Sequence, residues 1–204
     1  MNHKTEPWNK GVAVGQKAPF TTEQVWKIRR TLETKEAWRD LALFSVGLDS
    51  MLRSSDLLVL TVGDVCDHIN SVKSQFTCKQ QKTGQSVTVG LSKYTRDALK
   101  LWLEETGKSR SHYLFTSLRN RGNQPIGRIQ YSKLIKSWAK SIRLNPDDYS
   151  THSVRRSLPA LIYAETQNIE VIRQLLGQSS VKATSHYLNI DGQHSLDIAH
   201  KFRF

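Results

Sequence analysis

One segment of this chain differs from the rest in the spacing of its apolar residues, and that segment constrains the fold most. On either side of residues 70–91, apolar residues recur every three or four positions, which is the spacing of a helix that buries one face. Within residues 70–91 the pattern alternates in two short runs, around Ser71–Cys78 and Ser86–Leu91, and Gly84 between them suits a tight turn. The sequence therefore predicts a mostly α fold with one small antiparallel β-hairpin sheet, which is an α+β chain.

Start and stop signals divide the helical regions into separate helices. Thr21, with Gln24 three residues later, is typical of a capping box, so we expect the first helix to begin there. The next helix, from Glu36 to Leu48, is apolar around most of its circumference, which predicts a central core helix that ends near Gly47. Further helices are expected over Lys93–Thr106, 128–142, His152 to about Glu165, Ile169–Leu176 and Val181–Leu188.

The chain is expected to have three parts. Residues 1–19 mix lysines with glycines and prolines and have no periodic apolar face, which predicts a basic, flexible tail. Residues 20–191 suit one folded domain, since domains commonly hold about 100–200 residues. Residues 192–204 carry a small apolar set, which predicts a docking helix or tail at the C-terminus.

The charge of the chain indicates its class of partner. The 30 Lys+Arg residues exceed the 18 Asp+Glu residues and give a net charge of +12, which favours nucleic acid or an anionic surface. There is no signal peptide and no apolar run near the roughly 18 residues that a membrane span needs, so the cytoplasm is the expected location. Cys66 and Cys78 lack metal-ligand spacing and are expected to be reduced thiols, with no metal site.

Two basic residues stand at positions where an anion could bind. Arg53 directly precedes Ser54 and Ser55, which we expect to cap a helix, and a helix N-terminus attracts anions. Lys82 is expected at or near the tip of the hairpin, where its ammonium could donate a proton to a leaving oxygen. On spacing alone, an ordinary solvated side chain is the more common case for each of them.

A second group of candidates lies towards the C-terminus. His152 and Arg155 are three residues apart, so on a helix they project from one face and can converge on a small anion. Tyr187 follows a short segment punctuated by Gly177. A phenolic oxygen beside cations can attack a phosphodiester, although a tyrosine at helical spacing is more often a core residue.

Taken together, these residues resemble the catalytic domain of the tyrosine recombinases, the phage integrase family. The resemblance covers about residues 20–200. It is carried by Gly47-Leu48 leading to Arg53-x-x-Asp56-Leu57, then Lys82, His152-x-x-Arg155-Arg156, Leu175-Leu176-Gly177, Thr184 and Tyr187, in that order. Each motif alone is weak, whereas their common order and spacing make coincidence improbable.

The resemblance implies a role for each of these side chains. Arg53 and Arg155 would clamp the scissile phosphate while His152 helps to manage the proton of the nucleophile. Lys82 would protonate the leaving 5′ oxygen, and Tyr187 would attack to give a 3′-phosphotyrosyl bond. The energy of that bond is kept for religation, so the resemblance implies no cofactor and no metal.

The chain also departs from the family pattern at two places. Gln178 follows Gly177 where the family usually has histidine or tryptophan; its amide can donate to a phosphate oxygen but cannot carry a proton. The helical core-binding domain that usually precedes the catalytic domain is not expected in residues 1–19.

The resemblance also implies partners. They are double-stranded DNA, which would place the protein on the nucleoid, a tetramer assembled through the C-terminal tail, and a second recombinase or an accessory protein. The alternative to a site-specific recombinase is a catalytically weak DNA-binding regulator or accessory protein of the same fold. A third reading, nicking and closing without strand exchange, uses the same residues.

Overall fold

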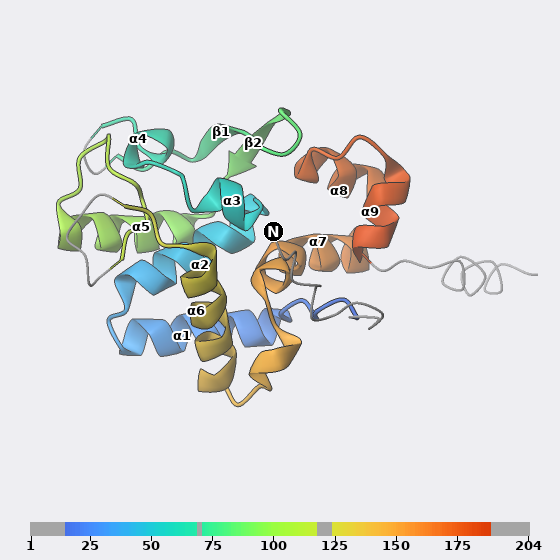
Figure 1. The fold of residues 1–204 in the computed structure, drawn as a ribbon, viewed down its shortest axis with the longest axis horizontal. Helices are drawn as coiled ribbons and strands as arrows, with labels where there is room; N and C mark the ends of the chain where they lie inside the picture. The colour runs from blue at the N-terminus through green and yellow to red at the C-terminus, as the bar shows by residue number, and fades with distance from the viewer. Residues whose placement is uncertain (1–14, 69–70, 118–123, 189–204) are drawn as a thin grey trace, which may run out of the picture.

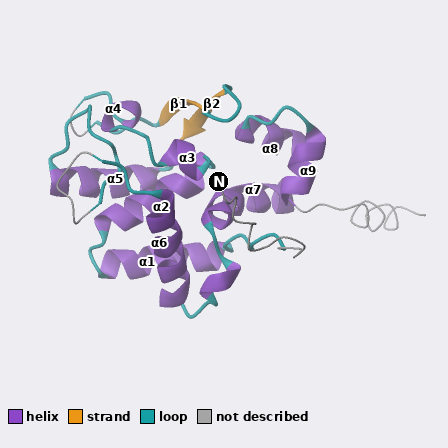
Figure 2. Cartoon of the chain, in the orientation of Figure 1, coloured by secondary structure: helices purple, strands orange, loops and turns teal. Residues whose placement is uncertain are grey.

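The computed structural model describes residues 15–68, 71–117 and 124–188, and it confirms a mostly helical chain with one two-stranded antiparallel sheet (Figures 1 and 2). The predicted C-terminal docking tail, residues 192–204, lies outside the described residues. In chain order the described elements are α1 (Thr22–Thr34), α2 (Trp38–Ser50), α3 (Ser54–Leu57), α4 (Val62–Val65), β1 (Gln75–Lys79), β2 (Ser86–Gly90), α5 (Lys93–Thr106), α6 (Arg128–Ser141), the 3-10 helix η1 (Pro146–Asp148), α7 (Thr151–Thr166), α8 (Ile169–Leu176) and α9 (Val181–Leu188).

Helix α2 is the centre of the main core. Its apolar side chains are buried on nearly every side, and it packs against α1, α5 and α7. The predicted end of this helix near Gly47 is wrong, because α2 runs on to Ser50. A Cβ at position 47 would lie 3.0 Å from both Tyr131 Oη and Val154 Cγ1, so Gly47 lets α6 and α7 approach α2 closely.

The starts of α1 and α7 and the ends of α5 and α8 follow local capping chemistry, as the sequence predicts. Thr21 and Gln24 form the capping box of α1, and Ser150 caps α7 through the N–H of His152. Gly107 and Gly177 end α5 and α8 in the left-handed conformation that glycine adopts without strain.

The hairpin is shorter at its start than the alternating pattern predicts. Strand β1 begins at Gln75 rather than near Ser71, because Val72 pairs only with Cys66 in an isolated bridge. In the hairpin, Phe76 pairs with Val89, and both side chains are buried. The inner face of the hairpin also brings β2 against α8.

A second, smaller core holds the C-terminal helices. Its buried members are Met51, Ile172 and Leu176, and it is separate from the main core around α2. Helices α8 and α9 therefore rest on a small apolar cluster next to the main body (Figure 1). Partly buried residues packed against it are Leu158, Ile162, Tyr163, Tyr187 and Leu188.

The segment just before α1 contacts the C-terminal half of the chain. Gln16 Nε2 donates to the carbonyl oxygen of His186 in α9 at 2.7 Å, and Arg156 Nη1 in α7 donates to the carbonyl oxygen of Lys17 at 2.8 Å. These contacts fasten α9 to α7 from the N-terminal side. Within the part of the chain described here, no helix is both long and apolar enough to span a membrane.

Gly177 gives a direct test of the joint between α8 and the hairpin. It has φ +62°, and a Cβ there would come within 2.4 Å of Val87 Cγ1 and 3.2 Å of Gln80 Nε2. We expect Gly177→Ala to lower the free energy of unfolding by the roughly 1–2 kcal/mol of a left-handed alanine plus about 1–3 kcal/mol of overpacking. Urea denaturation followed by circular dichroism measures the loss.

Gly107→Ala is the matched control for this prediction. Gly107 has φ +59° with no atom within 4 Å of a built Cβ, so it should lose only the left-handed contribution. Equal losses in the two variants would contradict a close approach of the hairpin to Gly177.

Candidate active site

The N-terminal turns of α7 present His152 and Arg155 on one face. Ser150 fixes the start of the helix, so the two residues lie one turn apart as their spacing predicts. Arg155 is only 4% exposed, and its Nε and Nη1 have no hydrogen-bond partner within the described residues. Buried donors are usually paired, so this guanidinium is ready to bind an anion that is not part of the chain.

Arg53 approaches the same region from α3. The prediction that Ser54 or Ser55 caps this helix is wrong, because Arg53 itself occupies the N-cap position. Its guanidinium Nη1 donates to Gln80 Oε1 in the hairpin. The positive charge of Arg53 also acts to lower the pKa of His152 and that of Arg155.

Tyr187 in α9 lies against two arginines of α7. The Cζ atoms of Arg155 and Arg156 are 5.6 and 5.8 Å from the centroid of its ring, and its hydroxyl is buried beside the guanidinium of Arg155. Burial raises the pKa of the Tyr187 phenol to about 12, although the nearby charges of Arg155, Arg156 and Arg53 act to lower it. The phenol is therefore neutral at pH 7, with cations placed to stabilise an oxyanion.

His152 is poised as a neutral base. Although the residue as a whole is exposed, local desolvation lowers the pKa of its imidazole below the ordinary value, and the charges of Arg155, Arg156 and Arg53 lower it further. A neutral imidazole can accept a proton at physiological pH. His152 lines a cavity of about 350 Å³ together with Tyr187 and Gln178.

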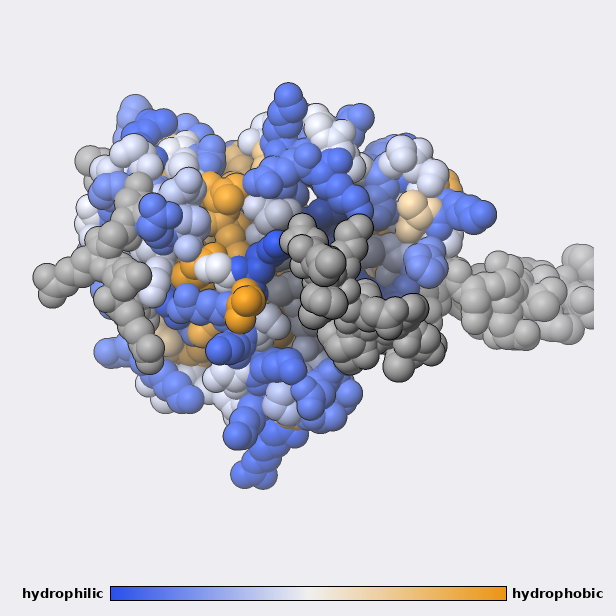
Figure 3. Space-filling model, viewed as in Figure 1, coloured by the Kyte–Doolittle hydropathy of each residue, from blue (hydrophilic) through white to orange (hydrophobic). Residues whose placement is uncertain are grey.

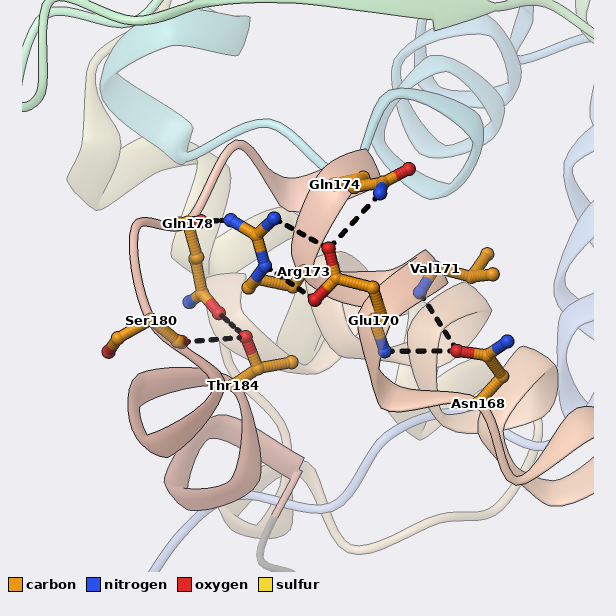
Figure 4. Close-up of polar contacts among 8 residues, drawn as sticks. All are labelled: Asn168, Glu170, Val171, Arg173, Gln174, Gln178, Ser180 and Thr184. Carbon is orange, nitrogen blue, oxygen red and sulfur yellow. Dashed lines mark hydrogen bonds and ion pairs between the residues drawn. The ribbon is translucent and has the colours of Figure 1, made fainter.

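Gln178 is held at this cavity by its neighbours (Figure 4). Its backbone carbonyl accepts from Arg173 Nη1 at 2.7 Å, and Arg173 is itself paired with Glu170. Its side-chain Oε1 accepts from Thr184 Oγ1 at 2.6 Å. In this orientation the amide N–H groups of Gln178 remain free, within the described residues, to donate to an anion.

Lys82 is the predicted site residue that the structure does not bring into contact with the others. It lies in the turn between β1 and β2, and its side chain is exposed. No hydrogen bond or ion pair joins it to another described residue. Its role as a proton donor remains a prediction. By contrast, the charge of Arg53, which precedes α3, acts on the pKa values of Arg155 in α7 and Tyr187 in α9.

Three further residues belong to this region and were not assigned a role from the sequence: Asp56, Gln80 and Arg156. Asp56 is 1% exposed; its Oδ1 accepts from the backbone N–H of Gln81 at 3.0 Å, while Oδ2 has no partner among the described residues. Burial lowers the pKa of Arg155, and the charge of Asp56 opposes that change. Asp56 and Arg156 belong to the motifs that carry the family resemblance, but neither of them was assigned a function from the sequence. No sequence signal indicated Gln80.

The arrangement suits attack on an anionic phosphate. Guanidinium groups from α3 and α7 can donate to its oxygens, and a phenol and a neutral imidazole lie beside them. The polar atoms left free are mostly donors, as an anionic ligand requires.

Comparison with known proteins shows the family of this chain. Residues 19–194 match the phage integrase family. The chain is 31% identical over 173 residues to the probable integrase/recombinase YoeC of Bacillus subtilis (strain 168), covering 83% of this chain and 87% of that protein. It also matches XerC tyrosine recombinases, of which it spans about half the length (47% for that of Erythrobacter litoralis).

Solved structures show the same fold. The crystal structure of XerA recombinase superposes with a TM-score of 0.71 at 18% identity, covering 93% of this chain and 67% of that one. XerH site-specific recombinase, solved bound to its difH substrate before cleavage, gives a TM-score of 0.69 at 18% identity, covering 92% of this chain and 55% of that one.

The ionisation of His152 tests the electrostatics of the site. Because local desolvation and three arginines lower its pKa, we expect its imidazole to titrate below 6.5. Sulfate bound between the arginines adds negative charge and should raise that pKa. Proton NMR titration measures both effects, and His152→Gln identifies the resonance by its loss.

Chloride at the same ionic strength is the control, because it screens charge without bridging two guanidinium groups. A midpoint at or above 6.5 without sulfate, or the same response to both salts, would contradict an anion site beside His152.

Proposed function

Since the chain belongs to the phage integrase family, we propose that it is a site-specific DNA recombinase that cuts and rejoins DNA through a 3′-phosphotyrosyl intermediate at Tyr187. The observation that carries this proposal is the contact between the ring of Tyr187 and the guanidinium of Arg155. Two buried donors of that guanidinium, Nε and Nη1, lack partners in the described structure.

The reaction assigns a step to each side chain. Arg53 and Arg155 bind the non-bridging oxygens of the scissile phosphate, with the amide of Gln178 as a further donor. Tyr187 Oη attacks phosphorus as the bond to the 5′ oxygen breaks. The 5′ hydroxyl of another strand then attacks the phosphotyrosyl bond and restores the phosphodiester.

Proton transfer follows the same path in each direction. His152, neutral at pH 7, accepts the phenolic proton of Tyr187 during attack and returns it during religation. Lys82 supplies a proton to the leaving 5′ oxygen. Since Lys82 lies in the exposed hairpin turn, this step requires the turn to lie over the bound DNA.

The size of the barrier shows why the cations are needed. A phenol with a pKa of about 12 is roughly five units from neutral pH, which corresponds to about 7 kcal/mol. Preorganised donors are typically worth about 2.7–4 kcal/mol each in a transition state. Because that pKa already includes the charges of Arg155, Arg156 and Arg53, the remaining cost falls on His152, which removes the proton as the bond forms, and on the donors that bind the phosphate.

Double-stranded DNA is the partner that we propose. The net charge of +12 favours binding to its phosphates, and hydrophilic side chains cover most of the face drawn in Figure 3. XerH, with the same fold, is solved bound to its DNA substrate. Assembly into a tetramer through residues 192–204 belongs to the same proposal.

A catalytically weak DNA-binding regulator is the second candidate. It is favoured by Gln178, which cannot carry a proton, and by the lack of a described contact for Lys82. Covalent chemistry distinguishes the two functions, because a regulator needs neither the phenol of Tyr187 nor a proton donor in the hairpin.

Tyr187→Phe tests the nucleophile. We expect this variant to lose covalent attachment to DNA by about 10³-fold or more while DNA binding is kept, because only the attacking oxygen is removed. The assay uses labelled duplexes with a central nick and randomised flanking sequence, which trap the adduct by releasing the short cleaved strand.

Tyr163→Phe is the matched control, because Tyr163 packs on the same small cluster as Tyr187. It should form the adduct normally. Full adduct formation by Tyr187→Phe would refute the assignment of the nucleophile, and no adduct from the unaltered protein would favour the regulator.

Lys82→Ala tests the proton donor. We expect slow cleavage of a normal phosphodiester, by about 10²-fold or more, and nearly normal cleavage when sulfur replaces the 5′ bridging oxygen. A thiolate leaves without a proton, so the general acid is not needed. The single-turnover rates on the two substrates are compared, and equal defects would make Lys82 a phosphate contact instead.

A further inference from the structure

Gln80 occupies an unusual position for a polar residue, because it is only 2% exposed yet uses both ends of its side-chain amide. Its Oε1 accepts from Arg53 Nη1 and from Thr83 Oγ1, the latter at 3.1 Å. Its Nε2 donates to the carbonyl oxygen of Leu176 at 2.9 Å. One buried side chain thus joins α3, the hairpin and the end of α8.

The bond to Leu176 fixes the corner from which Gln178 projects. Leu176 is the last residue of α8, and Gly177 follows it in the left-handed conformation. A Cβ at Gly177 would lie 3.2 Å from Gln80 Nε2, so the corner approaches Gln80 closely only because residue 177 has no side chain. Gln178 continues from this corner into the cavity beside Tyr187.

The chemistry of this position requires a neutral amide. Arg53 needs an acceptor, and the carbonyl of Leu176 needs a donor; one terminal amide supplies both. A carboxylate would supply no donor and would pair with the charge of Arg53, which would then compete with phosphate for that guanidinium. An amide oxygen orients Arg53 without neutralising it.

We propose that Gln80 is a positioning residue for strand transfer, which sets Arg53 and the Gln178 corner at the distance at which both reach one phosphate. This inference rests on the proposed function for its substrate. It adds a residue that touches neither the phosphate nor the nucleophile and acts through Arg53 and Gln178.

The substitution Gln80→Glu tests this role, with Gln85→Glu as the matched control. Gln85 is exposed in the same hairpin, and its side chain makes no described hydrogen bond. The substitution Gln85→Glu therefore adds the same negative charge without disturbing the contacts that Gln80 makes. We expect Gln80→Glu to slow adduct formation at saturating DNA by about 10²-fold, the usual effect of losing one preorganised donor. DNA affinity should change little, because Arg53 would be one of many phosphate contacts made by a chain with a net charge of +12.

A neutral substrate separates positioning from a structural defect. A methylphosphonate at the scissile position lacks one negative oxygen, so the charge of Arg53 matters less there. The defect of Gln80→Glu should shrink on this substrate to about 10-fold or less. Equal defects on both substrates, or a normal rate on the phosphodiester, would overturn the proposal.

A second variant and a second readout guard against misfolding and against failure of the proposed function. Gln80→Met keeps the volume without adding charge and should show the same dependence on substrate charge. Sulfate should raise the melting temperature of the unaltered protein and Gln85→Glu more than that of Gln80→Glu, with chloride as the reference.

The change in melting temperature with sulfate tests the role of Gln80 even if the unaltered protein forms no adduct with DNA. Equal stabilisation of Gln80→Glu and Gln85→Glu would overturn the inference. The absence of an adduct together with unequal stabilisation would overturn the proposed recombinase activity alone.

Discussion

The buried guanidinium of Arg155 is the constraint on which the rest of the site depends. Two of its donors have no partner in the described part of the chain, and an unpaired buried donor costs about 1–3 kcal/mol. The main core around α2 offsets that cost, because α7 packs against α2 and carries Arg155 with it. A bound phosphate would supply the missing acceptors, as the proposed function requires.

The proposed nucleophile, Tyr187, depends on a weaker part of the fold. Tyr187 rests on the small cluster of Met51, Ile172 and Leu176, which buries much less apolar surface than the main core. Polar contacts add to this support: Gln80 ties the end of α8 to the hairpin, and Gln16 holds the end of α9. The position of the phenol relative to Arg155 therefore reflects several hydrogen bonds as well as packing, and the C-terminal helices are the part of the site most open to adjustment.

Local signals predicted most of the fold. A capping box sets the start of α1, and left-handed glycines set the ends of α5 and α8, because these signals depend on neighbours in sequence. The end of α2 was predicted wrongly because Gly47 is needed for contact with Tyr131 and Val154, which are distant in sequence.

In the site, too, features that depend on neighbours in sequence could be predicted, and features that depend on distant contacts could not. Spacing placed His152 and Arg155 on one face, and order along the chain suggested that Arg53 and Tyr187 join them. Gln80 could not have been found in this way, because its partners Arg53 and Leu176 lie 27 and 96 residues away. The unpaired state of Arg155 also depends on tertiary burial, which no local pattern reveals.

The most direct test of the account is to identify the residue that carries DNA in the trapped adduct. Trypsin places the three tyrosines that follow α6 on different peptides: Tyr149 on residues 144–155, Tyr163 on 157–173 and Tyr187 on 183–201. After nuclease digestion, mass spectrometry should find the nucleotide remnant on residues 183–201, attached to Tyr187. A remnant on residues 144–155 or 157–173 would contradict the assignment of Tyr187 as the nucleophile and the role proposed for the arginines around it.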